Sequence, residues 1–251
     1  FKHGNKGNFD YTRSGNPNFK ILENTLKSIE DSKYCTVFGS GISAVTAITS
    51  TLKSGDKILC ESNLYGCTVR MFEKIFNKFG IEVLYTDFTD KENLEKIKDV
   101  DPTLIWLESP TNPLLKVLDI KLICDEANKQ KIPVVLDNTF STAIIQKPLE
   151  LGATLSLIST TKFINGHSDA LGGAVLTNNK EWNNRMLFSQ KALGLQPSPF
   201  DSWLITRGVK TLPLRIEQQT RSAEMISSEF ENHRIISKLL YPFNQKHPQF
   251  H

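Results

Sequence analysis

The sequence has little that would favour disulfide bonds, metal binding or insertion into a membrane. Its four cysteines, at positions 35, 60, 67 and 124, form no CxxC pair and have no clustered histidines nearby, so no metal site is predicted. Such cysteine usage is typical of a reducing, cytoplasmic setting. No apolar run approaches the ~18 residues of a membrane-spanning helix, and the first residues do not follow a signal-peptide pattern.

A strong charge imbalance is also absent. The 30 lysines and arginines oppose 27 aspartates and glutamates, which gives a net charge of +3 without any block of like charge. Neither a nucleic acid nor a membrane surface is therefore expected as a partner. With 39% apolar residues among 251, the chain can bury the core of one large domain or two smaller ones.

Short β-branched or apolar segments alternate with helical patterns, which is typical of an α/β fold with a mostly parallel sheet and helices on both faces. Apolar residues at helical spacing predict helices over Val69–Phe79 and from Asp119 onward. From Glu181 the chain is expected to be mainly helical, with a long helix over Leu214–Phe230 before a strand-like stretch at Ile235–Leu240. The expected strands are Tyr34–Phe38, Lys57–Cys60, Glu82–Tyr85, Thr103–Leu107, Pro133–Leu136, Leu155–Ile158 and Gly173–Leu176.

The chain is expected to have three parts. Residues 1–18 are rich in Gly, Asn and Lys and predict an extended arm. Residues 19–220 would form the main domain, and residues 221–251 would begin a second one. Because the chain starts inside a polar segment and stops soon after a strand-like stretch, we expect it to be a fragment of a longer chain.

Lys162 is the sharpest chemical feature, since Ser159-Thr160-Thr161-Lys162 follows a predicted strand. Ligands of open α/β sheets bind at the carboxyl ends of the strands, and a desolvated lysine there can attack a carbonyl. The hydroxyls at 159 and 161 could hold a phosphate. Taken alone, a lysine in this place is more often a solvated surface residue.

Two further strand ends carry groups suited to a ligand. Asp137 ends an apolar run, and its carboxylate could pair with a protonated pyridine nitrogen or simply cap the next turn. The turn after Phe38 offers backbone amides for an anion. Its Gly39, Gly41 and Ala44 also match a dinucleotide-binding pattern, with Glu61 20 residues beyond Gly41, so a nicotinamide oxidoreductase is an alternative. An ordinary tight turn is a third interpretation.

Tyr65 and Asn112 come from two more strand ends. The Tyr65 ring could stack on a planar cofactor, although most such tyrosines only pack. Asn112 lies in Glu108–Pro113, whose two prolines favour a rigid loop, and could bind a ligand oxygen or merely belong to a turn. Five strand ends thus offer phosphate-binding amides, a flat ring, an amide, an acid and a lysine.

These motifs resemble the Cys/Met metabolism family of enzymes that depend on pyridoxal phosphate (PLP), and the likeness covers nearly the whole chain. The resemblance implies a three-layer α/β/α fold of PLP-transferase type I, with a smaller C-terminal domain that is largely missing here, together with its carboxylate-binding arginine. The motifs that carry it are Asp10–Pro17, Ser40-Gly41, Tyr65-Gly66, Glu108–Pro113, Asp137–Phe140 and Ser159–Asp169.

The resemblance also implies a role for each candidate. Lys162 would form a Schiff base with the cofactor and move protons, Asp137 would hold the ring nitrogen, and Tyr65 would stack on the ring. The phosphate would be bound around Ser40 by the amides of Gly41 and Ile42, with help from Ser159 and Thr161. Asn112 would contact cofactor and substrate, and Arg70 matches a substrate-binding position, unless it is an ordinary solvated arginine.

Within this family, Tyr11 and Arg13 of the arm reach a neighbouring subunit's site, which implies a dimer as the smallest complete unit and a dimer of dimers as the usual assembly. The implied substrates are sulfur amino acids. Segments 193–201 and 207–212 resemble the γ-lyase branch, with the γ-synthase branch close to it. Asn18, Cys67 and Phe163 depart from the family pattern without removing a cofactor group. A truncated, inactive form is the non-enzymatic alternative.

Overall fold

The protein is described by a computed structural model, which places residue 9 and residues 11–250. Its centre is a seven-stranded sheet with the strand order β1-β7-β6-β5-β4-β2-β3. The strands are β1 (Tyr34–Phe38), β2 (Lys57–Glu61), β3 (Glu82–Thr86), β4 (Leu104–Glu108), β5 (Val134–Asp137), β6 (Leu155–Ile158) and β7 (Gly173–Thr177).

The strand directions place several polar loops on one edge of the sheet. Strands β3, β2, β4, β5 and β6 run parallel to one another, whereas β7 runs antiparallel to both β6 and β1. Because β1 is antiparallel to β7, it points in the same direction as β6. The carboxyl ends of β1, β2, β4, β5 and β6 therefore meet at one edge, where open α/β sheets bind their ligands.

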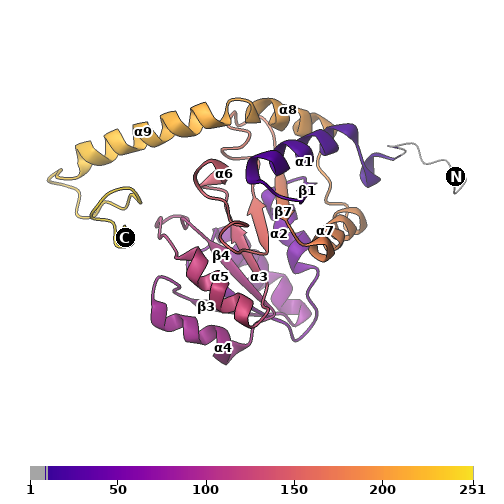
Figure 1. The fold of residues 1–251 in the computed structure, drawn as a ribbon, viewed down its shortest axis with the longest axis horizontal. Helices are drawn as coiled ribbons and strands as arrows, with labels where there is room; N and C mark the ends of the chain where they lie inside the picture. Colours follow the sequence, from indigo (N-terminus) through magenta and orange to yellow (C-terminus); the bar gives the residue numbers. More distant parts are fainter. Residues whose placement is uncertain (1–8, 10, 251) are drawn as a thin grey trace, which may run out of the picture.

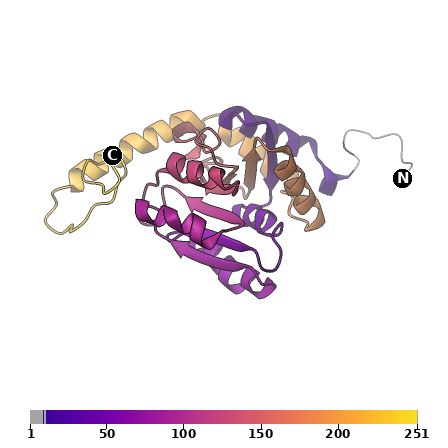
Figure 2. The same ribbon diagram turned by 60° about the horizontal axis from the view of Figure 1, so that its bottom comes forward.

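Helices cover both faces of the sheet and complete the expected three-layer α/β/α fold (Figure 1 and Figure 2). Helices α2, α3 and α7 pack on one face, whereas α1, α5 and α8 pack on the other. The helices are α1 (Pro17–Glu30), α2 (Gly41–Thr49), α3 (Gly66–Lys74), α4 (Lys96–Val100), α5 (Ile120–Lys129), α6 (Thr142–Ile145), α7 (Lys180–Ala192), α8 (Pro199–Val209) and α9 (Leu212–Phe230), with short 3-10 helices η1 (Thr12–Ser14), η2 (Phe76–Phe79) and η3 (Lys91–Glu95).

Alternate residues of β4 show how the layers are built. Trp106 faces the cluster under α2 and α3, where its ring meets Phe72 edge-on at 5.2 Å between centroids. Its neighbours Ile105 and Leu107 point to the opposite face and pack with the apolar side of α5. Successive side chains of a strand point to opposite faces, so a continuous apolar run fits a strand that is covered on both sides.

All seven expected strands are present, and their bounds differ from the expected ones by at most one residue. The helix expected from Asp119 is α5, and Asp119 caps it by accepting a hydrogen bond from the amide of Leu122. The long helix expected over Leu214–Phe230 is α9. Half of the expected arm, residues 1–8 and 10, lies outside the described residues. In its remainder, η1 is a single turn and Pro17 already begins α1.

The single helix expected over Val69–Phe79 was wrong, because the chain forms α3 and then η2. Ile75 has φ −114° and ψ −64°, which ends the α-helix there. Of the predicted apolar stripe, Phe72 and Phe76 are buried, whereas Ile75 and Phe79 are 52% and 65% exposed. Because the backbone leaves the α-helical path at Ile75, the four apolar side chains do not share one buried face.

The strand expected at Ile235–Leu240 was also wrong. After α9 the chain makes turns, in which the amide of Ile236 donates to the carbonyl of His233 at 2.9 Å. The sheet contains no strand from this segment, and the side chain of Ile235 is 78% exposed. A strand requires a neighbouring strand for its backbone hydrogen bonds, and the described chain offers none there.

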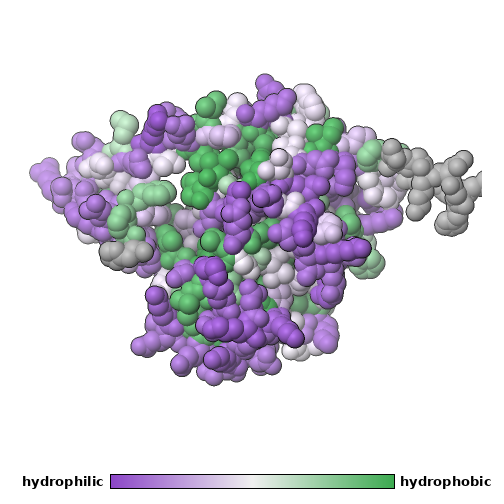
Figure 3. Space-filling view, viewed as in Figure 1, coloured by the Kyte–Doolittle hydropathy of each residue, from purple (hydrophilic) through white to green (hydrophobic). Residues whose placement is uncertain are grey.

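Apolar and polar surfaces are unevenly distributed. Figure 3 shows apolar side chains around the junction of α6, α8 and α9, and mainly polar side chains over α4. Exposed apolar residues near this junction include Ile144, Ile145 and Leu214. Among the described helices, none combines the length and the apolar character that crossing a membrane would require.

Candidate functional site

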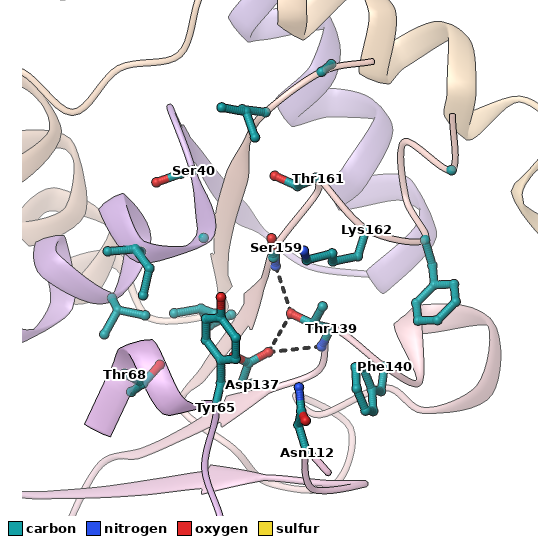
Figure 4. A pocket seen from close by; sticks show the side chains of 18 of the residues that line it. Ser40, Tyr65, Thr68, Asn112, Asp137, Thr139, Phe140, Ser159, Thr161 and Lys162 are labelled. Carbon is teal, nitrogen blue, oxygen red and sulfur yellow. Dashed lines mark hydrogen bonds between the residues drawn. The ribbon is translucent and has the colours of Figure 1, made fainter. Parts of the chain in front are cut away.

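A cavity of about 1080 Å³ lies at the carboxyl edge of the sheet. Its volume matches the upper end of the ~300–1,000 Å³ range of small-molecule sites. The loops that follow β1, β2, β4, β5 and β6 all contribute to its wall (Figure 4). Nine of the predicted site residues line it, namely Ser40, Gly41, Ile42, Tyr65, Asn112, Asp137, Ser159, Thr161 and Lys162.

The amino end of α2 forms one side of the cavity. Ser40 caps this helix, because its Oγ accepts a hydrogen bond from the Ser43 amide at 3.0 Å. Gly41 lies so close to the end of β6 that a Cβ there would be 2.8 Å from Cβ of Ser159. The first backbone amides of the helix, those of Gly41 and Ile42, therefore lie beside Ser159. The partial positive charge at the start of a helix suits an anion.

Asp137 forms the floor. Its Oδ1 accepts hydrogen bonds from the amide of Thr139 at 3.0 Å and from Thr139 Oγ1 at 2.6 Å. The same hydroxyl accepts a hydrogen bond from the Ser159 amide at 2.9 Å, so it joins the β5 and β6 loops (Figure 4). Both bonds to Asp137 use Oδ1, which leaves Oδ2 for a ligand. Burial raises the pKa of Asp137 despite these bonds, so a cation beside it would be stabilised strongly.

Glu108 lies directly beside Asp137, since the two residues are register partners at the ends of β4 and β5. Its carboxylate accepts hydrogen bonds from the amide of Tyr65 at 2.7 Å and from the amide of Asn112 at 2.8 Å, one on each oxygen. Burial and then the charge of Asp137 raise the pKa of Glu108 to about 8. One acid thereby holds the two loops that bring Tyr65 and Asn112 to the cavity.

The Tyr65 ring stands in the cavity and is 39% exposed, so one face is open to a ligand (Figure 4). A hydrogen bond with the Cys67 thiol raises the pKa of Tyr65 above its ordinary value. Asn112 follows β4 in a loop that contains cis peptide bonds before Pro110 and Pro113. Both side chains point toward the space above Asp137.

Lys162 extends into the cavity from the turn after β6, toward Ser159 (Figure 4). The turn is closed by a hydrogen bond from the Gly166 amide to the Lys162 carbonyl at 2.8 Å. Within the described part of the chain, Lys162 is the single cationic side chain of the lining. The lining acids are Glu108, Asp137, Asp169 and Asp201. An anionic ligand would therefore need further positive charge from elsewhere.

Thr161 lines the cavity with a hydroxyl that is already engaged. Its Oγ1 donates to the Gly172 carbonyl at 3.1 Å and accepts from the Gly172 amide at 3.0 Å. The hydroxyl proton is thus used within the protein, and one lone pair remains. The phosphate contact expected of this residue stays a prediction.

Three predicted residues do not line the cavity of their own chain. Tyr11 and Arg13 lie in and beside η1, where the guanidinium stacks over the Tyr11 ring at 5.1 Å and donates to the Lys191 carbonyl at 3.2 Å. Arg70 turns back along α3 and contacts the Gly66 carbonyl and the Cys67 sulfur, both at 3.2 Å. Their expected roles remain predictions.

The sequence motifs contained Glu108 and Thr139, but no role was predicted for either. A signal for Glu108 existed, because it ends a predicted strand as Asp137 does, and parallel strands bring such ends together. Thr139 follows Asp137 by two residues, a spacing at which an aspartate commonly accepts bonds from the turn it begins. The link from Thr139 to Ser159 spans 20 residues and needs the fold.

The dinucleotide interpretation is not supported. That motif requires a strand, a helix and a second parallel strand beside the first, whereas β1 and β2 lie at separate places in the sheet. Glu61, the acid that would bind a ribose, is completely buried. Its carboxylate already accepts hydrogen bonds from the amides of Asn63 and Phe88 at 3.1 and 2.9 Å.

Comparison with known proteins gives a consistent result. Human cystathionine γ-lyase is 39% identical over 253 residues, an alignment that covers 99% of this chain and 62% of the relative. A cystathionine γ-synthase from Xanthomonas oryzae pv. oryzae, solved in complex with cystathionine, superposes with a TM-score of 0.94 at 35% identity, over 98% of this chain and 64% of that one. An apo methionine γ-lyase from Micromonospora echinospora gives a TM-score of 0.92 at 34% identity, over 96% of this chain and 65% of that one.

The chain therefore spans about 62–65% of the length of these relatives. A family model described as Cys/Met metabolism PLP-dependent enzyme matches residues 1–251. This chain belongs to the Cys/Met metabolism family of enzymes, whose cofactor is pyridoxal phosphate.

Proposed function

We propose that the cavity at the carboxyl edge binds pyridoxal phosphate, with Lys162 as its covalent attachment point. The observation that carries the proposal is the convergence of Lys162, Asp137 and the start of α2 on one cavity, although they come from three separate strand ends. A reactive amine, a buried acid and an anion site are the three groups that this cofactor requires.

The residues present fit the cofactor. The amides of Gly41 and Ile42, with Ser40 and Ser159 beside them, would hold the phosphate at the start of α2. Gly41 has no room for a Cβ, which keeps this helix start close to β6.

The ring would lie against Tyr65, with Asn112 bonding to an oxygen of the cofactor or the substrate. Asp137, with one oxygen free, would hold the proton of the ring nitrogen. That proton is retained because a buried carboxylate strongly favours a cation beside it.

When bound, pyridoxal phosphate would supply an aldehyde for the substrate amine and an electron-withdrawing ring. The Lys162 amine would take the proton from the substrate α-carbon and return it after the side chain has reacted. Lys162 suits this role because it is the amine among the described lining residues and it extends into the cavity where the substrate would bind.

We propose that the substrates are sulfur amino acids, and that the first candidate reaction is that of a cystathionine γ-lyase, which converts cystathionine to cysteine, 2-oxobutanoate and ammonia. The support is the likeness of segments 193–201 and 207–212 to that branch and the relatives named as such lyases. Cystathionine γ-synthase, cystathionine β-lyase and methionine γ-lyase are the alternatives. The proposed setting is cytoplasmic, which agrees with four free cysteines.

Product analysis separates these reactions. The PLP-loaded protein would be incubated with cystathionine, with O-succinylhomoserine plus cysteine, and with methionine. The proposal predicts 2-oxobutanoate and cysteine from cystathionine. Homocysteine and pyruvate would instead indicate a β-lyase. Newly formed cystathionine would indicate a γ-synthase, and methanethiol would indicate a methionine γ-lyase. Lys162→Arg is the control, since any product that it still forms does not arise at Lys162.

We further propose that Tyr11 and Arg13 complete the site of a second copy of this chain. The support is electrostatic, because Lys162 is the one cation of the described lining, which also contains Asp137, Asp169 and Asp201, whereas a bound phosphate needs added positive charge. A dimer would be the smallest complete unit, with a dimer of dimers as the expected assembly. Arg70, in the middle of α3, is the proposed contact for the substrate.

Mixed oligomers test this exchange. Arg13→Ala and Lys162→Arg chains, each inactive alone, would be mixed and allowed to exchange subunits. If the arm acts on the partner's site, mixed dimers contain one site with both residues intact and regain activity. If Arg13 serves its own chain, no mixed site is intact and activity stays absent.

A further inference from the structure

Arg215 of α9 contacts the turn that carries Lys162, from 51 and 52 residues away in the sequence. Its Nη1 donates to the carbonyl of Phe163 at 2.6 Å, and its Nη2 donates to the carbonyl of Ile164 at 3.1 Å. These are the two residues that directly follow Lys162. The contact therefore reaches the backbone beside the proposed reactive amine.

The remaining donors of Arg215 fix it to the junction of α8 and α9. Nη2 also donates to the Gly208 carbonyl at 2.9 Å, and Nε donates to Thr211 Oγ1 at 3.0 Å. The guanidinium is thus bound at four oxygens in a planar, two-sided arrangement that a lysine ammonium cannot reproduce. Arg215 joins two parts of the chain, the Lys162 turn and the start of α9.

All four partners of Arg215 are neutral oxygens, and no carboxylate pairs with it in the described part of the chain. Burial lowers the pKa of Arg215, so its position costs free energy that an ion pair does not recover. A charged donor forms stronger hydrogen bonds to carbonyl oxygens than a neutral donor does. Two of its four contacts are with the turn after Lys162, so Arg215 holds that turn in place.

The backbones on both sides of Arg215 are packed closely. Gly166 has φ +72°, and a Cβ there would collide with the guanidinium. A Cβ on Gly208 would collide with the carbonyl of Asn165. Two positions without side chains therefore let the Lys162 turn sit directly against α8 and Arg215, which leaves the turn little freedom to shift.

We propose that Arg215 is a positioning residue that fixes the turn after Lys162 and so sets where the Lys162 amine stands in the cavity. The proposal rests on the proposed function only in taking Lys162 as the reactive amine. A displacement of about 1 Å of a reacting group can cost on the order of a hundredfold in rate. Loss of the four contacts is therefore expected to slow covalent attachment of the cofactor more than it weakens the fold.

The test compares Arg215→Met and Arg215→Lys with Arg221→Met, a control on the same helix whose guanidinium pairs with exposed Glu217. The first readout needs no cofactor: hydrogen exchange of the amides of Asn165 and Gly166, which close the Lys162 turn. The second is the rate at which added PLP becomes attached to Lys162, followed by borohydride trapping and peptide mass spectrometry. The third is recovery of that rate by free guanidinium ions.

The expected result for Arg215→Met is faster exchange confined to the turn and attachment slowed about tenfold or more, with partial recovery by guanidinium. Arg215→Lys should be intermediate, and Arg221→Met should match the unmodified protein. Unchanged exchange and unchanged attachment in both Arg215 variants would overturn the proposal. If Arg215→Met lost protection from hydrogen exchange throughout the sheet, its fold as a whole would be destabilised. The exchange of the turn and the rate of PLP attachment in Arg215→Lys would then decide. Failure of the unmodified protein to label Lys162 would instead reject the proposed function.

Discussion

Two buried acids, Glu108 at the end of β4 and Glu30 at the end of α1, have similarly raised pKa values and different surroundings. Glu108 has a pKa of about 8, accepts two backbone hydrogen bonds and lines the cavity beside Asp137. Glu30 ends α1 and is 1% exposed, and burial, against the opposing effect of Ser156, raises its pKa to about 7. Within the described residues, neither carboxylate oxygen of Glu30 meets the geometry of a hydrogen bond.

The comparison shows what the raised pKa of a buried acid does and does not indicate. Burial is the largest cause of the raised pKa of both acids, so the shift does not by itself mark a functional group. Glu108 differs because its two partners, Tyr65 and Asn112, belong to loops that face the same cavity. We therefore expect changes at the carboxyl edge to alter cofactor binding, and a change at Glu30 to alter stability alone.

The largest effect is expected at Asp137, which would hold the cofactor's ring nitrogen. Asp137→Asn removes the negative charge in a buried place, which should cost about 3 kcal/mol of cofactor and transition-state stabilisation, or on the order of a hundredfold in turnover. Steady-state kinetics and absorbance titration with PLP would measure it. Asp87→Asn, which alters an ion pair with Lys116 away from the cavity, is the control and should leave both unchanged.

A smaller effect is expected for Glu108→Gln. The amide nitrogen of glutamine would face the N–H of either Tyr65 or Asn112, so one loop should loosen at a cost of about 1–3 kcal/mol. We expect about tenfold weaker PLP binding in the same titration. The matched control is Glu61→Gln, since Glu61 is also buried and also accepts two backbone N–H groups but does not line the cavity. Equal losses of PLP affinity in both variants would contradict a specific role for Glu108.

For Glu30→Gln we expect no effect on cofactor binding, the smallest of the three. Because the folded pKa of Glu30 is about 7 against 4.5 in the unfolded chain, the folded state holds this proton more tightly, and its contribution to stability falls as pH rises from about 4.5 to 7. Glutamine does not ionise, so the variant should be more stable by about 1–3 kcal/mol at pH 8 and nearly unchanged at pH 4.5. Urea denaturation at both pH values would measure this, and a variant no more stable at pH 8 would show that Glu30 is not desolvated.

Much of the fold could be predicted from the sequence, because period-two and period-3.6 patterns report which faces are buried. The strand ends were located well enough to bring nine of the candidate residues together. The patterns failed at Phe79 and at Ile235–Leu240, where apolar side chains stay exposed. Whether such a side chain is covered depends on neighbours that local spacing does not specify.

The contacts that hold the site residues in place were less predictable from the sequence than the site residues themselves. Glu108 meets Tyr65 across 43 residues, and Arg215 meets Phe163 across 52. Both contacts join a side chain to backbone groups of a distant loop, and backbone groups have no residue-specific signature in a sequence. Roles that depend on such contacts emerge only when the loops are placed in space.

The most direct test of the central claim is to load the protein with pyridoxal phosphate, reduce it with borohydride, and locate the cofactor by peptide mass spectrometry. The account predicts one labelled lysine, Lys162, and no label in Lys162→Arg. Label on another lysine, or none on the unmodified protein, would contradict it.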